Sequence, residues 1–106
     1  FDTCHAFAAG YDLRSKEAYA KTMEEFDAII GYKFLSGMHL NDAKFALGSK
    51  KDRHESLGKG ELGFSAFKNI INDDKIGEIP LILETIDESI WEEEIKILRN
   101  FEKEKL

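Results

Sequence analysis

The chain has one cysteine, one proline and no long hydrophobic run among its 106 residues. A lone cysteine excludes an internal disulfide, which is typical of proteins from a reducing compartment. A membrane-spanning helix needs roughly 20 successive apolar residues, so we expect no membrane partner. We expect Cys4 to be a small buried residue, as free cysteines usually are. The alternative is a reactive thiol or a metal ligand.

Positive charge is also scarce. Fifteen Lys and Arg residues stand against 21 Asp and Glu residues, which gives a net charge of −6. Nucleic-acid-binding proteins usually present a basic surface, so the overall charge argues against such a partner. Residues 41–60 nevertheless carry more basic than acidic side chains. This segment could contact a phosphate, and a solvated loop with scattered lysines explains the charges equally well.

The length suits one small domain over residues 1–106. The sequence starts at Phe1 rather than at a methionine, and no turn or cap precedes Asp2. We interpret it as a fragment of a longer protein.

The first part of the chain predicts a strand, a helix and a second strand. We expect a strand end over residues 1–4 and then a loop up to Gly10. Apolar residues at helical spacing predict a helix over 16–30, with Ser15 as its N-cap and Gly31 after its end. Residues 32–40 predict the second strand.

The rest of the chain continues the alternation after a long loop over 41–63. We expect a short helix over 65–72 with Ser65 as its cap, then a strand over 79–83 that is buried on both faces. Ser89 and Glu92 have the spacing of a capping box at the start of a helix over 90–103. The glutamates at the start of this helix we interpret as structural. Alternating strands and helices predict parallel βα units.

Gly58, Gly60 and Gly63 have the G-x-G-x-x-G spacing of dinucleotide-binding loops. In those folds the motif directly follows a strand and opens a helix, whereas here it follows a charged loop. We therefore interpret it as a flexible turn, whose glycines could still let the backbone approach a phosphate.

Residues of metal-binding type follow each predicted strand. Asp2 and His5 lie at the end of the first strand, His39 at the end of the second and Glu84 at the end of the third. Carboxyl ends of parallel strands meet at one edge, where sites are built. Each residue alone is more often a cap or a surface group, but the set predicts a metal site.

Asp52 and His54 add a D-x-H spacing in the loop after the second strand. If the backbone is extended there, both side chains point the same way. Imidazole with carboxylate ligands suits zinc, and also iron or manganese.

The motifs together resemble signature stretches of the endonuclease IV family. The resemblance covers essentially the whole chain, and several motifs stand in the family's order. They are DTCH (2–5), HLNDAK (39–44), DRH (52–54), LGKG (57–60) and PLILET (80–85).

This resemblance implies an α/β fold in which the chain forms the C-terminal three βα units of a TIM (β/α)8 barrel, here incomplete. It also implies three zinc ions at the barrel's C-terminal face. One of these zincs depends on two histidines from earlier strands, and a glutamate from an earlier strand bridges it to another; none of the three lies in this chain. The two ligand sets represented here are Asp2, His39 and Glu84 for one zinc, and His5, Asp52 and His54 for another.

The implied activity is DNA repair by zinc-assisted hydrolysis of the phosphodiester 5′ to an abasic site in double-stranded DNA. Asp2 and Glu84 would act in catalysis through the metal. Arg53 is the best candidate for a DNA contact, followed by Lys44. We expect an intracellular location, the cytoplasm in a bacterium and the nucleus or a mitochondrion in a eukaryote.

Three units cannot close a barrel, which needs about 250 residues. Open sheet edges invite pairing with another chain, so we expect that the fragment either self-associates or was cut from a longer protein, and that it is inactive alone. Two alternatives stay open. One is a non-catalytic zinc-binding or assembly fragment, and the other is a sugar-isomerase-like metalloenzyme, which the basic Asp52-Arg53-His54 loop fits less well.

Overall fold

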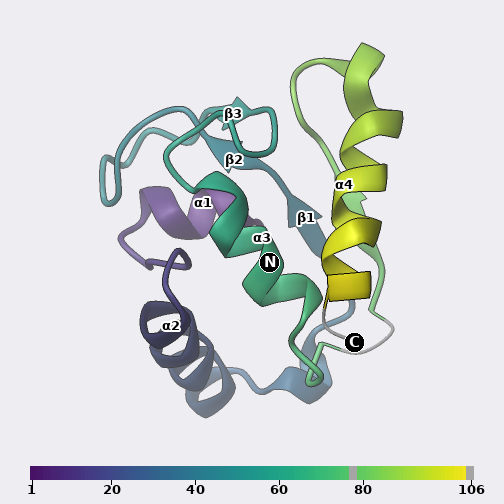
Figure 1. The fold of residues 1–106 in the computed structure, drawn as a ribbon. Coiled ribbons are helices and arrows are strands. Elements are labelled where there is room, and N and C mark those ends of the chain that lie inside the picture. Colours follow the sequence, from purple (N-terminus) through teal and green to yellow (C-terminus); the bar gives the residue numbers. More distant parts are fainter. Residues whose placement is uncertain (77–78, 105–106) are drawn as a thin grey trace.

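Two parallel strands, with one further residue bridged to them, form the centre of the structure; these are called the three parallel strand positions below. The computed structural model describes residues 1–76 and 79–104 (Figure 1). Strand β1 (Met38–Leu40) pairs in parallel with β4 (Leu81–Leu83), with His39 opposite Ile82. Asp2 forms an isolated parallel bridge to His39 on the other side of β1. The predicted alternation of parallel βα units is therefore confirmed.

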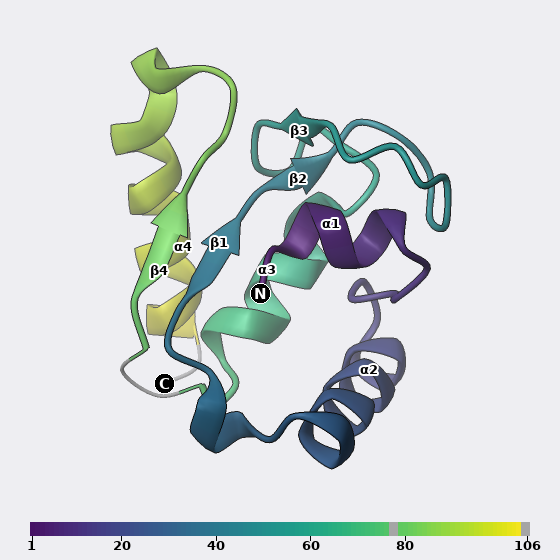
Figure 2. The same ribbon diagram turned by 180° about the vertical axis from the view of Figure 1, so that it is seen from behind.

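Two helices cover one face of these strands. Helices α3 (Gly63–Ile71) and α4 (Trp91–Glu104) contact each other and lie behind β1 and β4 in Figure 2. Met38 and Leu40 are buried, whereas His39 between them is exposed. Ile82 is 48% exposed. The expectation that residues 79–83 are buried on both faces is therefore wrong, because the described helices cover only one.

The core lies between the strands and the helices. Phe67 of α3 and Phe7 are fully buried, and Leu98 and Phe101 of α4 belong to the same buried cluster. Ile95 of the same helix stays 44% exposed. No helix in the described part of the chain combines the length and apolar character that crossing a membrane requires.

The first residues form a helix rather than the predicted strand end and loop. Helix α1 (Thr3–Ala8) begins directly after Asp2. Its N-cap is Asp2, whose Oδ1 accepts hydrogen bonds from the backbone amides of Cys4 (2.9 Å) and His5 (3.2 Å). A carboxylate that satisfies free amide groups of a first turn favours helix over strand at this point.

Helix α2 (Lys16–Ile29) has the predicted caps. The Ser15 hydroxyl accepts from the Ala18 amide at 3.0 Å, and Gly31 has a φ of 98° just past the helix end. The predicted strand over 32–40 is shorter, because Gly31 leads into a 3₁₀ turn, η1 (Tyr32–Phe34). Only Met38–Leu40 pairs as a strand.

The predicted long loop contains a small hairpin. Strands β2 (Asp42–Ala43) and β3 (His54–Glu55) pair antiparallel, with Ala43 opposite His54. Residues 44–53 connect them. After the hairpin, α3 begins at Gly63, two residues before the predicted cap Ser65, which is exposed within the helix.

The last helix is preceded by the 3₁₀ turn η2 (Glu88–Ile90). Its cap is Asp87, which accepts from the Ser89 amide at 3.0 Å. The predicted capping role of Ser89 is therefore taken by Asp87, two residues earlier.

Candidate metal centre

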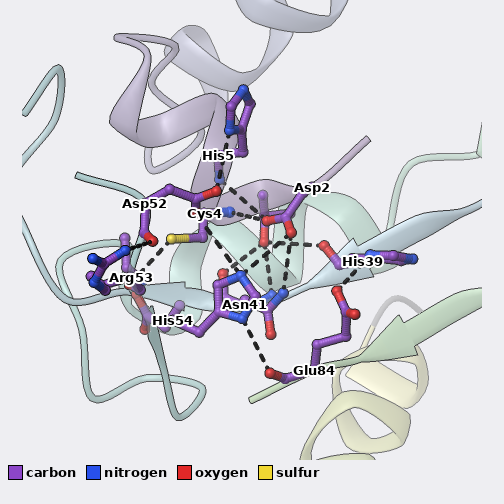
Figure 3. A network of polar contacts seen from close by, with 12 residues as sticks. Asp2, Cys4, His5, His39, Asn41, Asp52, Arg53, His54 and Glu84 are labelled. Carbon is purple, nitrogen blue, oxygen red and sulfur yellow. Dashed lines mark hydrogen bonds and ion pairs between the residues drawn. The ribbon is translucent and has the colours of Figure 1, made fainter. Parts of the chain in front are cut away.

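Asp2, His39 and Glu84 converge at the carboxyl ends of the three parallel strand positions (Figure 3). Each offers a ligand atom, and these atoms lie within 4.8 Å of one another. The sequence prediction that strand-end residues far apart in the chain meet at one edge is thus realised for these three. The parallel pairing brings them together, because it aligns Asp2 with His39 and sets Glu84 one residue beyond β4.

The two carboxylate oxygens of Asp2 have different partners. Its Oδ1 caps α1, as described above, which fixes the side chain. Its Oδ2 lies 3.5 Å from the side-chain nitrogen Nδ2 of Asn41 and 3.5 Å from Nε2 of His54. The second oxygen therefore faces the site, and its orientation is set by the helix start.

His39 and Glu84 form the closest pair in the site. Nδ1 of His39 lies 2.5 Å from Oε1 of Glu84. Both side chains are nearly half exposed, so they border the open end of the strands. An imidazole nitrogen and a carboxylate oxygen at this distance form a hydrogen bond, and the two atoms would have to move apart to bind the same cation.

A second group lies beside the first on the hairpin. Asp52 places one carboxylate oxygen 3.2 Å from Nδ1 of His5 and the other 3.9 Å from Nε2 of His54. Asp52 thus contacts both histidines that the family resemblance assigns with it. His5 has the most exposed side chain of the three, at 73%.

The pKa of Asp52 lies below its usual value. Partial burial acts to raise it, but hydrogen bonds from Cys4 and His5 and the nearby charges of His5 and His54 outweigh that effect. Asp52 therefore favours its charged form, which is the form that binds cations.

A backbone contact orients His54. Its Nδ1 lies 3.2 Å from the carbonyl oxygen of Glu84. A carbonyl can only accept, so this contact requires a proton on Nδ1 and leaves Nε2 facing Asp2 and Asp52. Such a partner behind the ring is typical of metal-binding histidines.

Cys4 belongs to the second group as well as to the core. It is fully buried, as expected, and its thiol donates to the carbonyl of Arg53 at 3.3 Å. Its sulfur also lies within 4.8 Å of ligand atoms of Asp52 and His54. The sequence favoured a buried core residue here and left a metal ligand as the alternative. Burial, a hydrogen bond to Asp52 and the negative charges of Asp52 and Asp2 raise its pKa to about 12.

The two predicted DNA contacts lie on the same hairpin. Arg53 and Lys44 are both exposed, and the Lys44 amide donates to the Arg53 carbonyl at 3.0 Å. The Arg53 guanidinium donates to the carbonyl of Asp52 at 3.1 Å. This hairpin thus carries both the D-x-H pair and its basic neighbours.

The glycine turn, defined here as residues 57–63, is not a flexible loop that is open to a phosphate. Backbone amides of Gly58, Gly60 and Gly63 donate instead to the buried carboxylate of Asp42. The expectation of a flexible turn is therefore wrong, because a carboxylate within the protein already occupies the amides.

The donor set fits a divalent cation. Asp2, Asp52 and Glu84 bring three carboxylates to one end of the strands, and among the described residues their ion pairs are with histidines alone. Zinc takes such nitrogen and oxygen ligands, and its charge would offset that of the three carboxylates.

We predict that Cys4 reacts slowly with alkylating reagents in the folded protein. Burial and the raised pKa leave little accessible thiolate at pH 8. Its alkylation by iodoacetamide should be slower than in urea by a factor on the order of 10² or more. Mass spectrometry of timed samples measures both rates, and equal rates would contradict the burial of this thiol.

Comparison with known proteins places this geometry in a family. A family model described as "Xylose isomerase-like TIM barrel" matches residues 1–101. "Probable endonuclease 4" of Campylobacter concisus (strain 13826) is 92% identical over 105 residues, which are 99% of this chain and 37% of that protein. The protein of the same description from Campylobacter curvus (strain 525.92) is 75% identical over 98% of this chain and 37% of its own length.

A solved structure is also similar to this chain. The crystal structure of endonuclease IV from Thermus thermophilus matches with a TM-score of 0.85 and 32% sequence identity, over 97% of this chain and 38% of that chain. The chain spans 37% of the length of the two Campylobacter relatives. The resemblance to endonuclease IV is thus confirmed, and the described strands and helices are part of an incomplete barrel. The chain belongs to the xylose isomerase-like TIM barrel family.

Proposed function

We propose that this chain supplies metal-binding strand ends to an abasic-site endonuclease that acts in DNA repair. The observation that carries the proposal is the convergence of Asp2, His39 and Glu84 at three neighbouring strand ends. The relatives named endonuclease 4, which match nearly all of the chain, support the same activity. The substrate would be double-stranded DNA, cut at the phosphodiester 5′ to an abasic site.

Two sets of side chains would hold zinc in this proposal. Asp2, His39 and Glu84 form one set. Asp52 and His54 form the centre of the other, with His5 or Cys4 beside them. A bound zinc ion lowers the pKa of its water and neutralises charge on a phosphodiester.

The chain's own contribution is to hold these ligands in place before substrate arrives. The α1 cap fixes Asp2, and the Glu84 carbonyl fixes the His54 ring. Ligands held by such contacts need little rearrangement to bind a cation, which favours both affinity and a fixed geometry.

Arg53 and Lys44 would bind the DNA backbone. Arg53 lies between Asp52 and His54 in sequence and is exposed, so a phosphate at the site would lie near its guanidinium. Lys51 lies over the Phe45 ring at 4.9 Å, which places another cation on the loop 44–53. This local basic surface would offset the acidic net charge, and it favours a nucleic-acid substrate over a sugar.

The exposed apolar surfaces of the described residues would be covered in a protein of the relatives' length. Ile82 of β4 is 48% exposed, and Ile29 of α2 is 76% exposed. A groove of about 340 Å³ beside Asp2 and His5 is lined by Phe26 and Ile29. The rest of a barrel would cover these surfaces. In the isolated chain, exposed apolar edges of this kind would favour self-association.

We predict that Glu84→Gln in a full-length protein containing this chain lowers cleavage of an abasic-site duplex about 10²-fold or more. The amide cannot supply the negative ligand that the site needs. Metal analysis of the same preparation should show less zinc per chain. Gel-based cleavage kinetics measure the first effect and plasma mass spectrometry the second.

The matched control is Glu93→Gln, which removes the same charge from an exposed position on α4. It should leave both cleavage and zinc content unchanged. Undiminished cleavage by Glu84→Gln would refute the proposed role. Zinc binding without any cleavage in the unmodified protein would instead indicate a metal-binding module.

Arg53→Ala should weaken binding to DNA through the loss of a phosphate contact. We expect the slope of log K against log salt to fall by about 1, as is typical when one phosphate contact is lost. Fluorescence anisotropy at several salt concentrations measures it. Lys33→Ala is the control, because Lys33 is an exposed cation on η1, far from the hairpin (Figure 1). Equal slopes in both variants would exclude the predicted contact.

A further inference from the structure

Asp42 is a fully buried carboxylate on β2 whose partners are all backbone amides. The side chain lies outside both candidate ligand groups. Five N–H groups donate to it, and four of them come from the glycine turn. The donors are Ala43 (2.7 Å) and Leu62 (2.8 Å) to Oδ1, and Gly58 (2.9 Å), Gly60 (3.1 Å) and Gly63 (3.2 Å) to Oδ2.

The glycines make this close approach possible. Gly58 and Gly63 have φ values of +81° and +68°, in the left-handed region that favours glycine. A Cβ at Gly60 would overlap the Ala43 carbonyl oxygen and the Asp42 carboxylate. The G-x-G-x-x-G spacing therefore wraps the backbone around a carboxylate from within the chain.

Glu94 of α4 is a second buried carboxylate, 2% exposed. Its Oε2 accepts from the Leu57 amide at 2.8 Å, at the start of the glycine turn. Its Oε1 accepts from the Thr85 hydroxyl at 2.6 Å. Trp91, one helical turn earlier, donates from its ring to the Thr85 carbonyl at 3.0 Å. The helix is thus tied to the glycine turn and to the residue after Glu84.

These contacts adjoin the candidate ligands in the chain. Ala43, next to Asp42, pairs with His54 across the hairpin, and Leu57 follows His54 by three residues. Thr85 directly follows Glu84, whose carbonyl orients the His54 ring. A buried charge needs its hydrogen bonds, so the backbone around both carboxylates has little freedom to shift.

We propose that Asp42 and Glu94 are positioning residues for the metal site. Asp42 fixes the hairpin that carries Asp52 and His54. Glu94 fixes the end of β4 that carries Glu84, together with the start of the glycine turn. This inference rests on the proposed function in taking these side chains as metal ligands.

The main test is Asp42→Asn in the full-length protein. The amide keeps the size of the carboxylate but turns an NH₂ group toward amide donors, which weakens the cradle. Metal affinity of the hairpin group, measured by competition with a chelator, should fall about 10- to 100-fold, as for other groups that orient ligands. The visible spectrum of the cobalt-loaded protein should change as well.

Glu94 offers a graded pair of variants. Glu94→Gln keeps an oxygen that accepts from the Leu57 amide and gains an NH₂ group that can donate to the Thr85 hydroxyl oxygen, so it should keep most of the metal affinity. Glu94→Leu removes both contacts and should lower the affinity and alter the cobalt spectrum. Glu93→Gln, on the exposed face of the same helix, is the control for the loss of charge and should change neither.

Stability alone would give a different pattern. If Asp42→Asn lowers the melting temperature of the metal-free protein but leaves metal affinity and cobalt spectrum unchanged, the positioning role is wrong. If Asp42→Asn does not fold, the comparison of Glu94→Leu with Glu94→Gln decides on the same readouts. Equal affinity and spectra in those two variants would overturn the proposal.

A metal-free readout separates this inference from the proposed function. The ring nitrogen resonances of His54, recorded by NMR on the metal-free protein, should shift in Asp42→Asn and stay in place in Glu93→Gln. Failure of the unmodified protein to bind metal or to cleave DNA would refute the proposed function, while these resonances would still report whether Asp42 positions His54. Unshifted resonances would refute the positioning role.

Discussion

Parallel pairing of β1 with β4, and of Asp2 with His39, is the constraint on which the site depends. It brings residues from positions 2, 39 and 84 to one edge, although nothing in their local sequence connects them. Helices α3 and α4 cover one face of the pairing (Figure 2), and Met38 and Leu40 of β1 are buried. His39 lies on the opposite face of the same strand. One alternating strand thus supplies a core contact and a candidate ligand from adjacent residues.

Structural and chemical roles are combined in single side chains throughout the site. Asp2 caps α1 with one oxygen and faces His54 with the other. Glu84 presents its carboxylate to His39 while its backbone carbonyl orients His54. Behind them, the buried carboxylates of Asp42 and Glu94 hold the backbone of the hairpin and of the β4 end. These four carboxylates therefore either face the site or have their hydrogen bonds supplied by the fold.

The convergence of Asp2, His39 and Glu84 was easier to predict from the sequence than the local structure around them. Strand-end positions of Asp2, His39 and Glu84 followed from alternation and apolar runs, and the caps of α2 followed from Ser15 and Gly31. Helix α1 was missed although an Asp before Thr3 is an ordinary N-cap signal. The hairpin could not be predicted, because two-residue strands leave no periodic pattern. The partners of Asp42 lie 16 to 21 residues away apart from Ala43, and they are backbone amides, which no side-chain pattern reveals.

The most direct measurement is anomalous diffraction at the zinc edge from crystals of the full-length protein. We predict a zinc peak bonded to Oδ2 of Asp2, to His39 and to Glu84, with Oδ1 of Asp2 still capping α1. Zinc bound elsewhere, while these three side chains contact only one another or solvent, would contradict the proposed metal site.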